Sequence, residues 1–484
     1  MMTSPENNDA AATDARPVHG RAALRRMLEP VSVALVGASP NAASLGGRTL
    51  ANLSTFPGRL YPVNGRHAEL AGRRCYPAVS DLPERPDCVV LAVPQEAVEA
   101  LATECAEFGV GAIVVLASGY AEVDEAGAQA QQRLVTIARR SGMRVVGPNC
   151  VGVAHRGAGL LAAFAEFPPG PAIVGARVGL VAQSGALGLG LSQAAEGGMS
   201  ISHVLTCGNS CDIDVADYVA YLAEAETCDS IALAFEGVGD ADRLSRALAL
   251  AASNGKPVAV CKLGTSEAGR AAARWHTNTA TDVPGGWTPL LAAAGAMPVQ
   301  NIEALMETAA FLAKAPRRRA AGRGVAVLSG SGGTAILAMD AAARHALATP
   351  QPGAATAARL AAAVPAFGSP RNPCDATAQA TRNPESLLEC ADALLADPQY
   401  AALVIPWGRS QPARLMDDID AMAARHGKAV CVVWMSQRLE SATTEKAQQL
   451  PHVALFHSLD HCMAALAHLV SSPPPLAQGL RPAE

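Results

Sequence analysis

Short apolar runs alternate with longer, partly polar stretches along most of the chain. Five such runs come first, each rich in Val, Ile, Leu and Ala, and they cover residues 31–38, 58–64, 87–93, 111–118 and 143–147. Continuous apolar runs without polar alternation are typical of parallel strands in a sheet that is covered on both faces. The pattern therefore predicts an α/β fold that begins with a five-stranded Rossmann-like sheet.

Two further groups of apolar runs predict two further doubly wound, flavodoxin-like domains. A breaker-rich segment at 166–171 precedes runs at 177–183, 201–208, 230–237 and 256–264, and a basic segment at 314–323 precedes runs at 324–330, 401–408 and 428–435. Breakers and charge runs between periodic segments favour domain boundaries. The predicted organisation is a disordered tail over residues 1–22, domains over residues 23–160, 171–316 and 322–471, and a second disordered tail over residues 472–484.

Each group contains one strand that runs into a small-residue turn before a helix, namely VALVGASPN, GLVAQSGALG and AVLSGSGGTA. Such a turn leaves free backbone N–H groups at the positive end of the helix dipole, which suits a phosphate group. The same turn can also serve only to reverse the chain tightly. The turns are therefore candidate phosphate sites, with a purely structural role as the alternative.

An NAD-dependent dehydrogenase is one hypothesis for such a fold. The turn after the first strand, Gly37-Ala38-Ser39, lacks the G-x-G-x-x-G pattern, and the second strand ends in Asn64 where an acid would hold the ribose. Both absences disfavour NAD. A different phosphate-bearing ligand stays compatible with the same turn.

Charge and cysteine content exclude several other classes. The chain has 38 basic and 43 acidic residues, a net charge of −5, so it carries no basic excess for a nucleic acid backbone. No apolar run reaches the roughly 18 residues of a membrane span, and residues 1–17 do not have the form of a secretory signal. The 12 cysteines form no C-x-x-C pair. We expect a cytoplasmic protein with reduced cysteines and no metal site.

Four motifs, in order, resemble the CoA-binding domain of the NDP-forming (ADP-forming) acyl-CoA synthetases and of the related succinyl-CoA ligase α subunit. They are VALVGASPN, GRLYPVN, CYPAVSDLPERPDCVVLAVP and VVGPNCVG. The resemblance implies a coenzyme A site lined by Gly37, Ala38, Ser39, Pro62, Val63, Asn64, Val93, Pro94 and Asn149. The two prolines could instead only end strands, and Asn149 could be a turn residue.

The second domain resembles the first succinyl-CoA-synthetase-like domain of the same family through LVAQSGALG, SCDIDVADYVAYL, ALAFEGVGD and VCKLGTSEAGRAAARWHTNTATD. The likeness continues through GVAVLSGSGGTAILAMD and SPRNPCDATA, so it covers about residues 31–470. It implies a phosphohistidine at His276, supported by Glu236, with the phosphoryl group facing the turn formed by Gln183, Ser184 and Gly185. Imidazole suits phosphoryl relay, because one nitrogen can attack while the other is held by a hydrogen bond.

The family implies a ligase that interconverts carboxylic acid, CoA and ATP with acyl-CoA, ADP and phosphate through an acyl phosphate and the phosphohistidine. No stretch of this sequence offers the additional ATP-grasp module or a P-loop. The resemblance therefore implies an α-type subunit, of the acetate–CoA ligase kind, in a heterotetramer with an ATP-grasp β-type partner that supplies ATP, ADP and Mg²⁺. The identity of the acid is not indicated.

The phosphohistidine motif departs from the family, which has Ser-His-Thr-Gly where this chain has Trp275-His276-Thr277-Asn278. A non-catalytic CoA- or acyl-CoA-binding protein of the same fold is therefore the alternative. Other polar residues favour structural roles more than functional ones: His155, His457 and His461, and the helix-start acids Asp212, Asp214 and Asp217.

Overall fold

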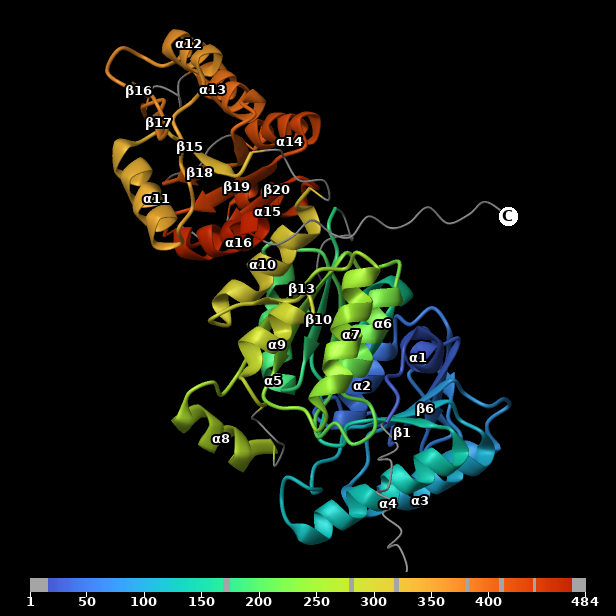
Figure 1. The fold of residues 1–484 in the computed structure, drawn as a ribbon. Helices are drawn as coiled ribbons and strands as arrows, with labels where there is room; N and C mark the ends of the chain where they lie inside the picture. Colours follow the sequence, from blue (N-terminus) through green and yellow to red (C-terminus); the bar gives the residue numbers. More distant parts are fainter. Residues whose placement is uncertain are drawn as a thin grey trace, which may run out of the picture.

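The computed structural model describes residues 16–168, 175–277, 283–316, 322–378, 383–408, 413–437 and 441–471, apart from the side chains of residues 274–277. It contains three large, mainly parallel sheets, each covered by helices, and the three bodies follow one another in chain order from bottom to top of Figure 1. The predicted α/β class is therefore confirmed. No helix of these ranges is both long and apolar enough to cross a membrane.

The first sheet is entirely parallel and has the order β2-β1-β5-β6-β7. Its strands are β1 (Ser32–Val36), β2 (Arg59–Val63), β5 (Cys88–Leu91), β6 (Ala112–Val115) and β7 (Arg144–Val146). Its helices are α2 (Leu45–Leu53), α3 (Gln95–Phe108) and α4 (Glu125–Ser141), and a small hairpin of β3 (Glu69–Leu70) and β4 (Arg73–Arg74) follows β2. All five predicted strands are confirmed. The strand order reverses between β1 and β5, which is where open α/β sheets bind ligands.

The second sheet has the order β14-β13-β12-β10-β11-β8-β9. The predicted strands are β10 (Val178–Ala182), β11 (Ile201–Thr206), β12 (Ser230–Phe235) and β13 (Val258–Lys262), and β14 (Met297–Pro298) adds a short edge. Its helices are α5 (Gly185–Ser192), α6 (Val215–Glu224), α7 (Ala241–Ser253), α8 (Glu267–Thr277), α9 (Trp287–Ala293) and α10 (Glu303–Lys314).

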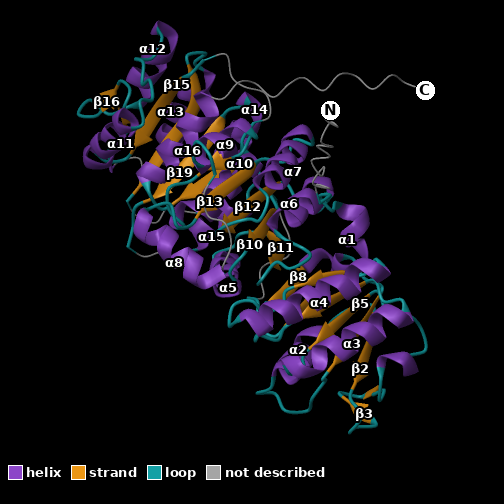
Figure 2. Cartoon of the chain, turned by 60° about the horizontal axis from the view of Figure 1, so that its bottom comes forward, coloured by secondary structure: helices purple, strands orange, loops and turns teal. Residues whose placement is uncertain are grey.

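A hairpin that the sequence prediction assigned largely to the first domain belongs to the second sheet. Strands β8 (Gly152–His155) and β9 (Leu160–Ala163) are antiparallel to each other, and β8 pairs antiparallel with β11. Figure 2 shows β8 beside β11, on the side nearer the first domain. The hairpin covers an edge of β11 that would otherwise expose unpaired backbone groups. The predicted boundary at residue 160 therefore falls within a hairpin of the second sheet.

The third sheet has the order β16-β17-β15-β18-β19-β20. The predicted strands are β15 (Gly324–Ser329), β18 (Tyr400–Trp407) and β19 (Ala429–Trp434), and the sequence analysis missed β16 (Ser369–Pro370), β17 (Cys374–Asp375) and β20 (Val453–Phe456). Its helices are α11 (Gly332–Arg344), α12 (Ala354–Ala363), α13 (Pro384–Ala396), α14 (Arg414–His426), α15 (Ala442–Gln449) and α16 (Leu459–Ser471).

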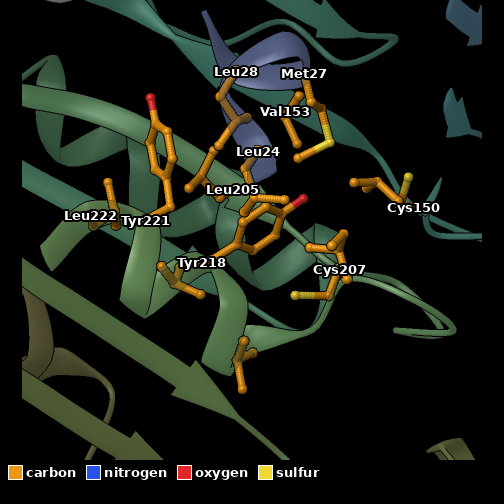
Figure 3. Close-up of a cluster of buried hydrophobic side chains, with 14 of the residues drawn as sticks. Leu24, Met27, Leu28, Cys150, Val153, Leu205, Cys207, Tyr218, Tyr221 and Leu222 are labelled. Atoms are coloured by element: carbon orange, nitrogen blue, oxygen red, sulfur yellow. The ribbon is translucent and has the colours of Figure 1, made fainter. Parts of the chain in front are cut away.

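The N-terminal helix α1 (Arg21–Leu28) joins the first two domains. Its buried residues Leu24, Met27 and Leu28 point toward Tyr218 and Tyr221 of α6, and Figure 3 shows this shared core. The aromatic rings and the aliphatic side chains together remove a large apolar area from water, so the two domains share one hydrophobic core at this point.

The prediction of a disordered tail over residues 1–22 is wrong for residues 16–22. The N–H of His19 donates to Asp217 Oδ1 at 2.7 Å, and the N–H of Arg21 donates to Glu224 Oε2 at 2.6 Å. The physical reason is that α6 presents acceptors to this segment, and one of them, Asp217, is buried and needs donors. Residues 1–15 and 472–484 lie outside the described residues, so the rest of that prediction stays untested.

The acids at the start of α6 have the structural roles that the sequence favoured. Asp214 caps the helix, accepting from the N–H groups of Ala216 and Asp217, and it forms a capping box with Asp217. The buried guanidinium of Arg243 pairs with both acids. Asp212 Oδ2 accepts the N–H of Val145 at 3.0 Å, which ties this segment to the edge strand β7.

Candidate functional site

A cavity of about 1080 Å³ lies at the carboxyl ends of the first sheet and is bordered on its other side by the second domain. It includes the strand-order reversal between β1 and β5. Nine residues predicted from the sequence line it: Gly37, Ser39, Val93, Pro94, Asn149, Gln183, Ser184, Gly185 and Glu236. The structure therefore brings five of the nine predicted CoA residues and the predicted phosphate turn to one cavity.

The turn after β1 can take only a residue without a side chain at Gly37. Its φ is +84°, and a Cβ built there would lie 2.3 Å from the carbonyl oxygen of Ala92. The chain of β5 therefore passes directly against the turn. Because no side chain stands at this position, backbone atoms form this part of the cavity wall. A phosphate-bearing ligand can therefore approach the backbone closely.

Four of the predicted CoA residues do not line the cavity. Ala38 is fully buried in the core, and Pro62 and Val63 pair with Leu35 and Val36 on the side of β1 away from β5. Asn64 supports the turn instead, because its Nδ2 donates to the carbonyl of Ala38 at 2.8 Å. Asn64 therefore supports the first turn, and a direct contact of these four residues with coenzyme A stays a prediction.

Asn149 lies at the other side of the cavity in a left-handed conformation, with φ of +57°. It follows a cis peptide bond between Gly147 and Pro148. Asparagine tolerates this region of backbone space better than most residues, so a turn role and a place in the cavity wall are compatible here.

The second domain contributes the turn between β10 and α5. Ser184 is the N-cap of α5, and its hydroxyl accepts the N–H of Leu187 at 3.4 Å. The buried side chain of Gln183 reaches to the next strand, where its Oε1 accepts the N–H groups of Glu236 at 2.8 Å and of Gly237 at 3.1 Å. Gln183 therefore holds the end of β12 so that Glu236, itself largely buried, lies at the cavity.

Two titratable groups of the cavity wall have shifted pKa values. Burial raises the pKa of the Cys150 thiol to about 12, so this side chain is neutral near pH 7 and is not an activated nucleophile. Burial also opposes ionisation of Glu122. Hydrogen bonds from the side chain of Asn209 and from the N–H groups of Gly119 and Tyr120 outweigh it and hold the pKa of Glu122 below its usual value. Glu122 is therefore an anion in the cavity wall.

Sequence reasoning missed much of the cavity lining. The missed residues include Ser44, Gln95, Leu116, Ser118, Glu122, Gln131, Phe164 and Asn209. Ser118 closes the predicted strand run at 111–118, so the carboxyl end of that strand was the signal that could have found it. Phe164 and Asn209 become part of the cavity only through the packing of two domains, which no local pattern indicates.

His276 lies near the end of α8, which projects from the second domain beside α5 in Figure 1. The side chains of Trp275 and His276, and the whole of Asn278, lie outside the described residues. The convergence of His276 with Glu236 and the Ser184 turn therefore stays a prediction.

The other three histidines that the sequence singled out take part in structural contacts. His155 is buried, its Nδ1 lies 2.9 Å from the carbonyl of Leu28, and its ring stacks on that of His203 at 4.0 Å. His457 Nδ1 lies 2.6 Å from Glu307, and His461 Nδ1 lies 3.5 Å from the same carboxylate. These contacts agree with the structural roles that the sequence favoured.

Two family models match the chain, one over the first domain and one over the second. A model described as a CoA binding domain matches residues 31–156, and one described as a succinyl-CoA ligase like flavodoxin domain matches residues 175–312. The α subunit of acetate–CoA ligase (ADP-forming) II from Pyrococcus furiosus is 32% identical over 387 residues, which cover 79% of this chain and 81% of that one. The chain belongs to the ADP-forming acyl-CoA synthetase family.

The family includes proteins longer than this chain. Acetate–CoA ligase (ADP-forming) I of Archaeoglobus fulgidus is 33% identical over 319 residues, which make up 66% of this chain but only 45% of that protein. A solved structure of the family matches almost the whole chain. It is the Ca. Korarchaeum cryptofilum dinucleotide forming acetyl-coenzyme A synthetase 1 in complex with phosphate and ADP, with a TM-score of 0.81, 27% identity, and coverage of 92% of this chain and 96% of that one. Both the family and the fold class expected from the sequence are thus confirmed.

Proposed function

We propose that this chain is the α-type subunit of an acid–thiol ligase that interconverts a carboxylic acid, coenzyme A and ATP with acyl-CoA, ADP and phosphate. The observation that carries the proposal is one cavity shared by the carboxyl-end edge of the first sheet and the Gln183-Ser184-Gly185 turn of the second domain. A thiol ester can form only where the CoA thiol and an activated acyl group meet. One cavity between the two domains supports such a meeting.

Coenzyme A would enter between the turn at Gly37 and Ser39 and the turn at Val93 and Pro94, with Asn149 on the opposite wall. The backbone approach at Gly37 and the positive end of the α2 dipole would favour its phosphates. No metal is needed for this contact. Mg²⁺ would accompany ATP and ADP on the partner.

The phosphoryl relay would use the second domain. In the direction of acyl-CoA formation, His276 would take the phosphoryl group from ATP and pass it to the carboxylate of the acid, which gives an acyl phosphate. The CoA thiol would then attack the carbonyl carbon of the acyl phosphate and release inorganic phosphate. In the reverse direction, His276 would take the phosphoryl group from the acyl phosphate, which releases the free acid, and pass it to ADP. Glu236 would orient the imidazole, and the dipole of α5 would attract the phosphoryl group by roughly 0.3 to 2 kcal/mol. Gln183 would act through Glu236, whose main chain it holds.

The nucleotide would be held by an ATP-grasp partner, in a heterotetramer. The name of the P. furiosus relative, an α subunit, supports a second kind of subunit. The bound ADP and phosphate in the K. cryptofilum complex support an ADP-forming reaction. All twelve cysteines are free, eleven of them buried, which supports a location in the reducing cytoplasm.

The test is phosphorylation of the chain by labelled ATP and Mg²⁺ in the presence of an ATP-grasp partner from the same source. We expect acid-labile, base-stable label on the chain, and its complete loss in His276→Ala. The matched control is His452→Ala, because this imidazole is exposed in the third domain, far along the chain from the cavity residues. Label that survives His276→Ala would show that another residue carries the phosphate.

The second candidate is a CoA-binding protein without the relay. Trp275 and Asn278, which replace small residues of the family motif, favour it. It predicts CoA binding with no label, even with a partner that phosphorylates a catalytic relative under the same conditions. A chain that is labelled and forms acyl-CoA excludes this candidate.

A further inference from the structure

The segment after β11 runs along the edge of the first sheet. Four hydrogen bonds join it to β7 and to the turn that follows β7. In three of them a backbone N–H of the segment donates to a backbone carbonyl: Ile213 to Val145 (3.1 Å), Cys211 to Gly147 (3.2 Å) and Asn209 to Pro148 (2.9 Å). In the fourth, the N–H of Val145 donates to Asp212 Oδ2 (3.0 Å). We call this row of bonds, over residues 145–148 and 209–213, the interdomain seam. It fixes the second domain against the first at one side of the cavity.

The side chain of Asn209 continues the seam across the cavity wall. Its Nδ2 donates to Glu122 Oε2 and to Gln131 Oε1, the latter at 3.0 Å. Its Oδ1 accepts from Asn149 Nδ2 at 3.3 Å. Both amide protons and the amide oxygen are therefore engaged, and three parts of the first domain are held by one amide of the second.

Glu122 is held in turn by the main chain. Its Oε1 accepts the N–H of Gly119 at 2.7 Å and its Oε2 accepts the N–H of Tyr120 at 3.2 Å. The carboxylate thus shapes the loop between β6 and α4, and Asn209 sets where that loop stands relative to Asn149. All four polar residues, Glu122, Gln131, Asn149 and Asn209, line the cavity.

We infer that Asn209 and Glu122 are positioning residues for coenzyme A. Their hydrogen bond sets the width of the cavity between the loop at residues 119–122 and the Asn149 turn. The inference rests on the proposed function, because it takes coenzyme A as the ligand. It assigns a specific task to two residues that the family motifs of the sequence did not single out.

The charge pattern of this pair allows a sharp test. Asn209→Asp keeps the shape of the side chain but replaces a donor with a carboxylate that faces the Glu122 carboxylate and the Gln131 carbonyl. Like charges at hydrogen-bond distance repel strongly when partly buried. Glu122→Gln added to Asn209→Asp restores one donor and one acceptor, with the direction of the bond reversed.

The measurement is calorimetric titration of the full chain with coenzyme A, together with thermal unfolding of each variant. We expect Asn209→Asp to weaken CoA binding at least tenfold with a native-like unfolding transition, and the double variant to recover most of that loss. Glu125→Gln is the matched control, since it makes the same chemical change three residues away on the exposed start of α4 and should leave affinity within twofold.

Each outcome decides the inference. Wild-type affinity in Asn209→Asp overturns it, and so does a loss that the double variant does not repair, because the effect would then not pass through the Asn209–Glu122 bond. A wild-type chain that does not bind coenzyme A contradicts the ligand assumed in the proposed function. That failure is seen before any variant is made.

Discussion

At the scale of single residues, the cavity depends on positions where the backbone leaves no room for a side chain. Gly37 is the clearest, because its positive φ and its approach to the Ala92 carbonyl act together. The two effects are separable. Gly72, in the small hairpin after β2, has a similar φ of +70° but nothing within 4 Å of a Cβ.

We predict that Gly37→Ala abolishes measurable CoA binding and lowers the free energy of unfolding by more than Gly72→Ala does. The φ strain common to both changes should cost about 1 to 2 kcal/mol. The additional clash at Gly37 must move the end of β5, and hence Val93 and Pro94. Urea unfolding and CoA titration of both variants check this, and equal losses in the two would show that the close approach is unimportant.

At the scale of elements, the docked segment over residues 16–20 and helix α1 depend on the charge state of one imidazole. His19 Nε2 lies 2.7 Å from Arg144 Nη1, so it must be the unprotonated acceptor. Burial is the main cause that lowers the pKa of His19 below 6.5, and the positive charge of the Arg144 guanidinium is the next. The Asp212 carboxylate raises this pKa, while the charges of Arg16 and Arg243 lower it further. Near neutral pH the ring is therefore in the form that the contact needs.

The consequence is a loss of stability in mild acid. Because the folded-state pKa lies below the unfolded value, the unfolded chain binds the proton more readily. This contribution is therefore complete above the unfolded value of about 6.5 and is lost as the pH falls from there through the lower folded-state pKa. His19→Gln can still accept from Arg144 through its amide oxygen and does not titrate. We expect the drop in unfolding free energy between pH 7.5 and pH 5.5 to be smaller in His19→Gln than in the wild type, as measured by urea unfolding. Equal drops would show that His19 does not contribute.

The elements themselves were largely predictable. All twelve apolar runs became strands, because a strand buried on both faces must be apolar throughout. The hairpin β8–β9 was missed, since its residues form an edge that pairs with a strand much later in the sequence. The docking of residues 16–22 was missed for a similar reason: a polar segment is ordered here by acids of α6, and no local periodicity records that.

At the scale of the whole molecule, helix α10 connects the second and third domains through one ammonium group. The buried Nζ of Lys314 donates to the carbonyls of Ala447, Gln448 and Val453 at 3.0, 2.9 and 2.9 Å. These carbonyls end α15 and begin β20, so the contact fixes the third domain to the linking helix. The cavity lies elsewhere, between the first two domains.

We predict that Lys314→Met destabilises the third domain and spares the cavity. Three buried carbonyls would lose their donor, at a cost of at least about 2 kcal/mol. Calorimetric unfolding should show a transition at lower temperature, while CoA affinity changes less than twofold. Lys446→Met is the control, because its partly exposed ammonium pairs with the exposed Asp417 and should matter little. A large loss of CoA affinity in Lys314→Met would show that the third domain shapes the cavity.

Site residues that stand at the ends of strands could be predicted from the sequence. Site residues that reach the cavity through the packing of two domains could not. Gly37, Ser39, Val93 and Pro94 follow strands of one sheet, so their meeting could be expected. Asn209 reaches the same cavity from another domain.

The shared core of α1 and α6 also bears on synthesis of the chain. The apolar face of Leu24, Met27 and Leu28 is made early on the ribosome, but Tyr218 and Tyr221, which cover it, emerge only after the whole first sheet and half of the second. Until then the part of this face that the two tyrosines cover stays exposed to water and to chaperones. The first domain should therefore reach its final packing during translation of the second, not before it.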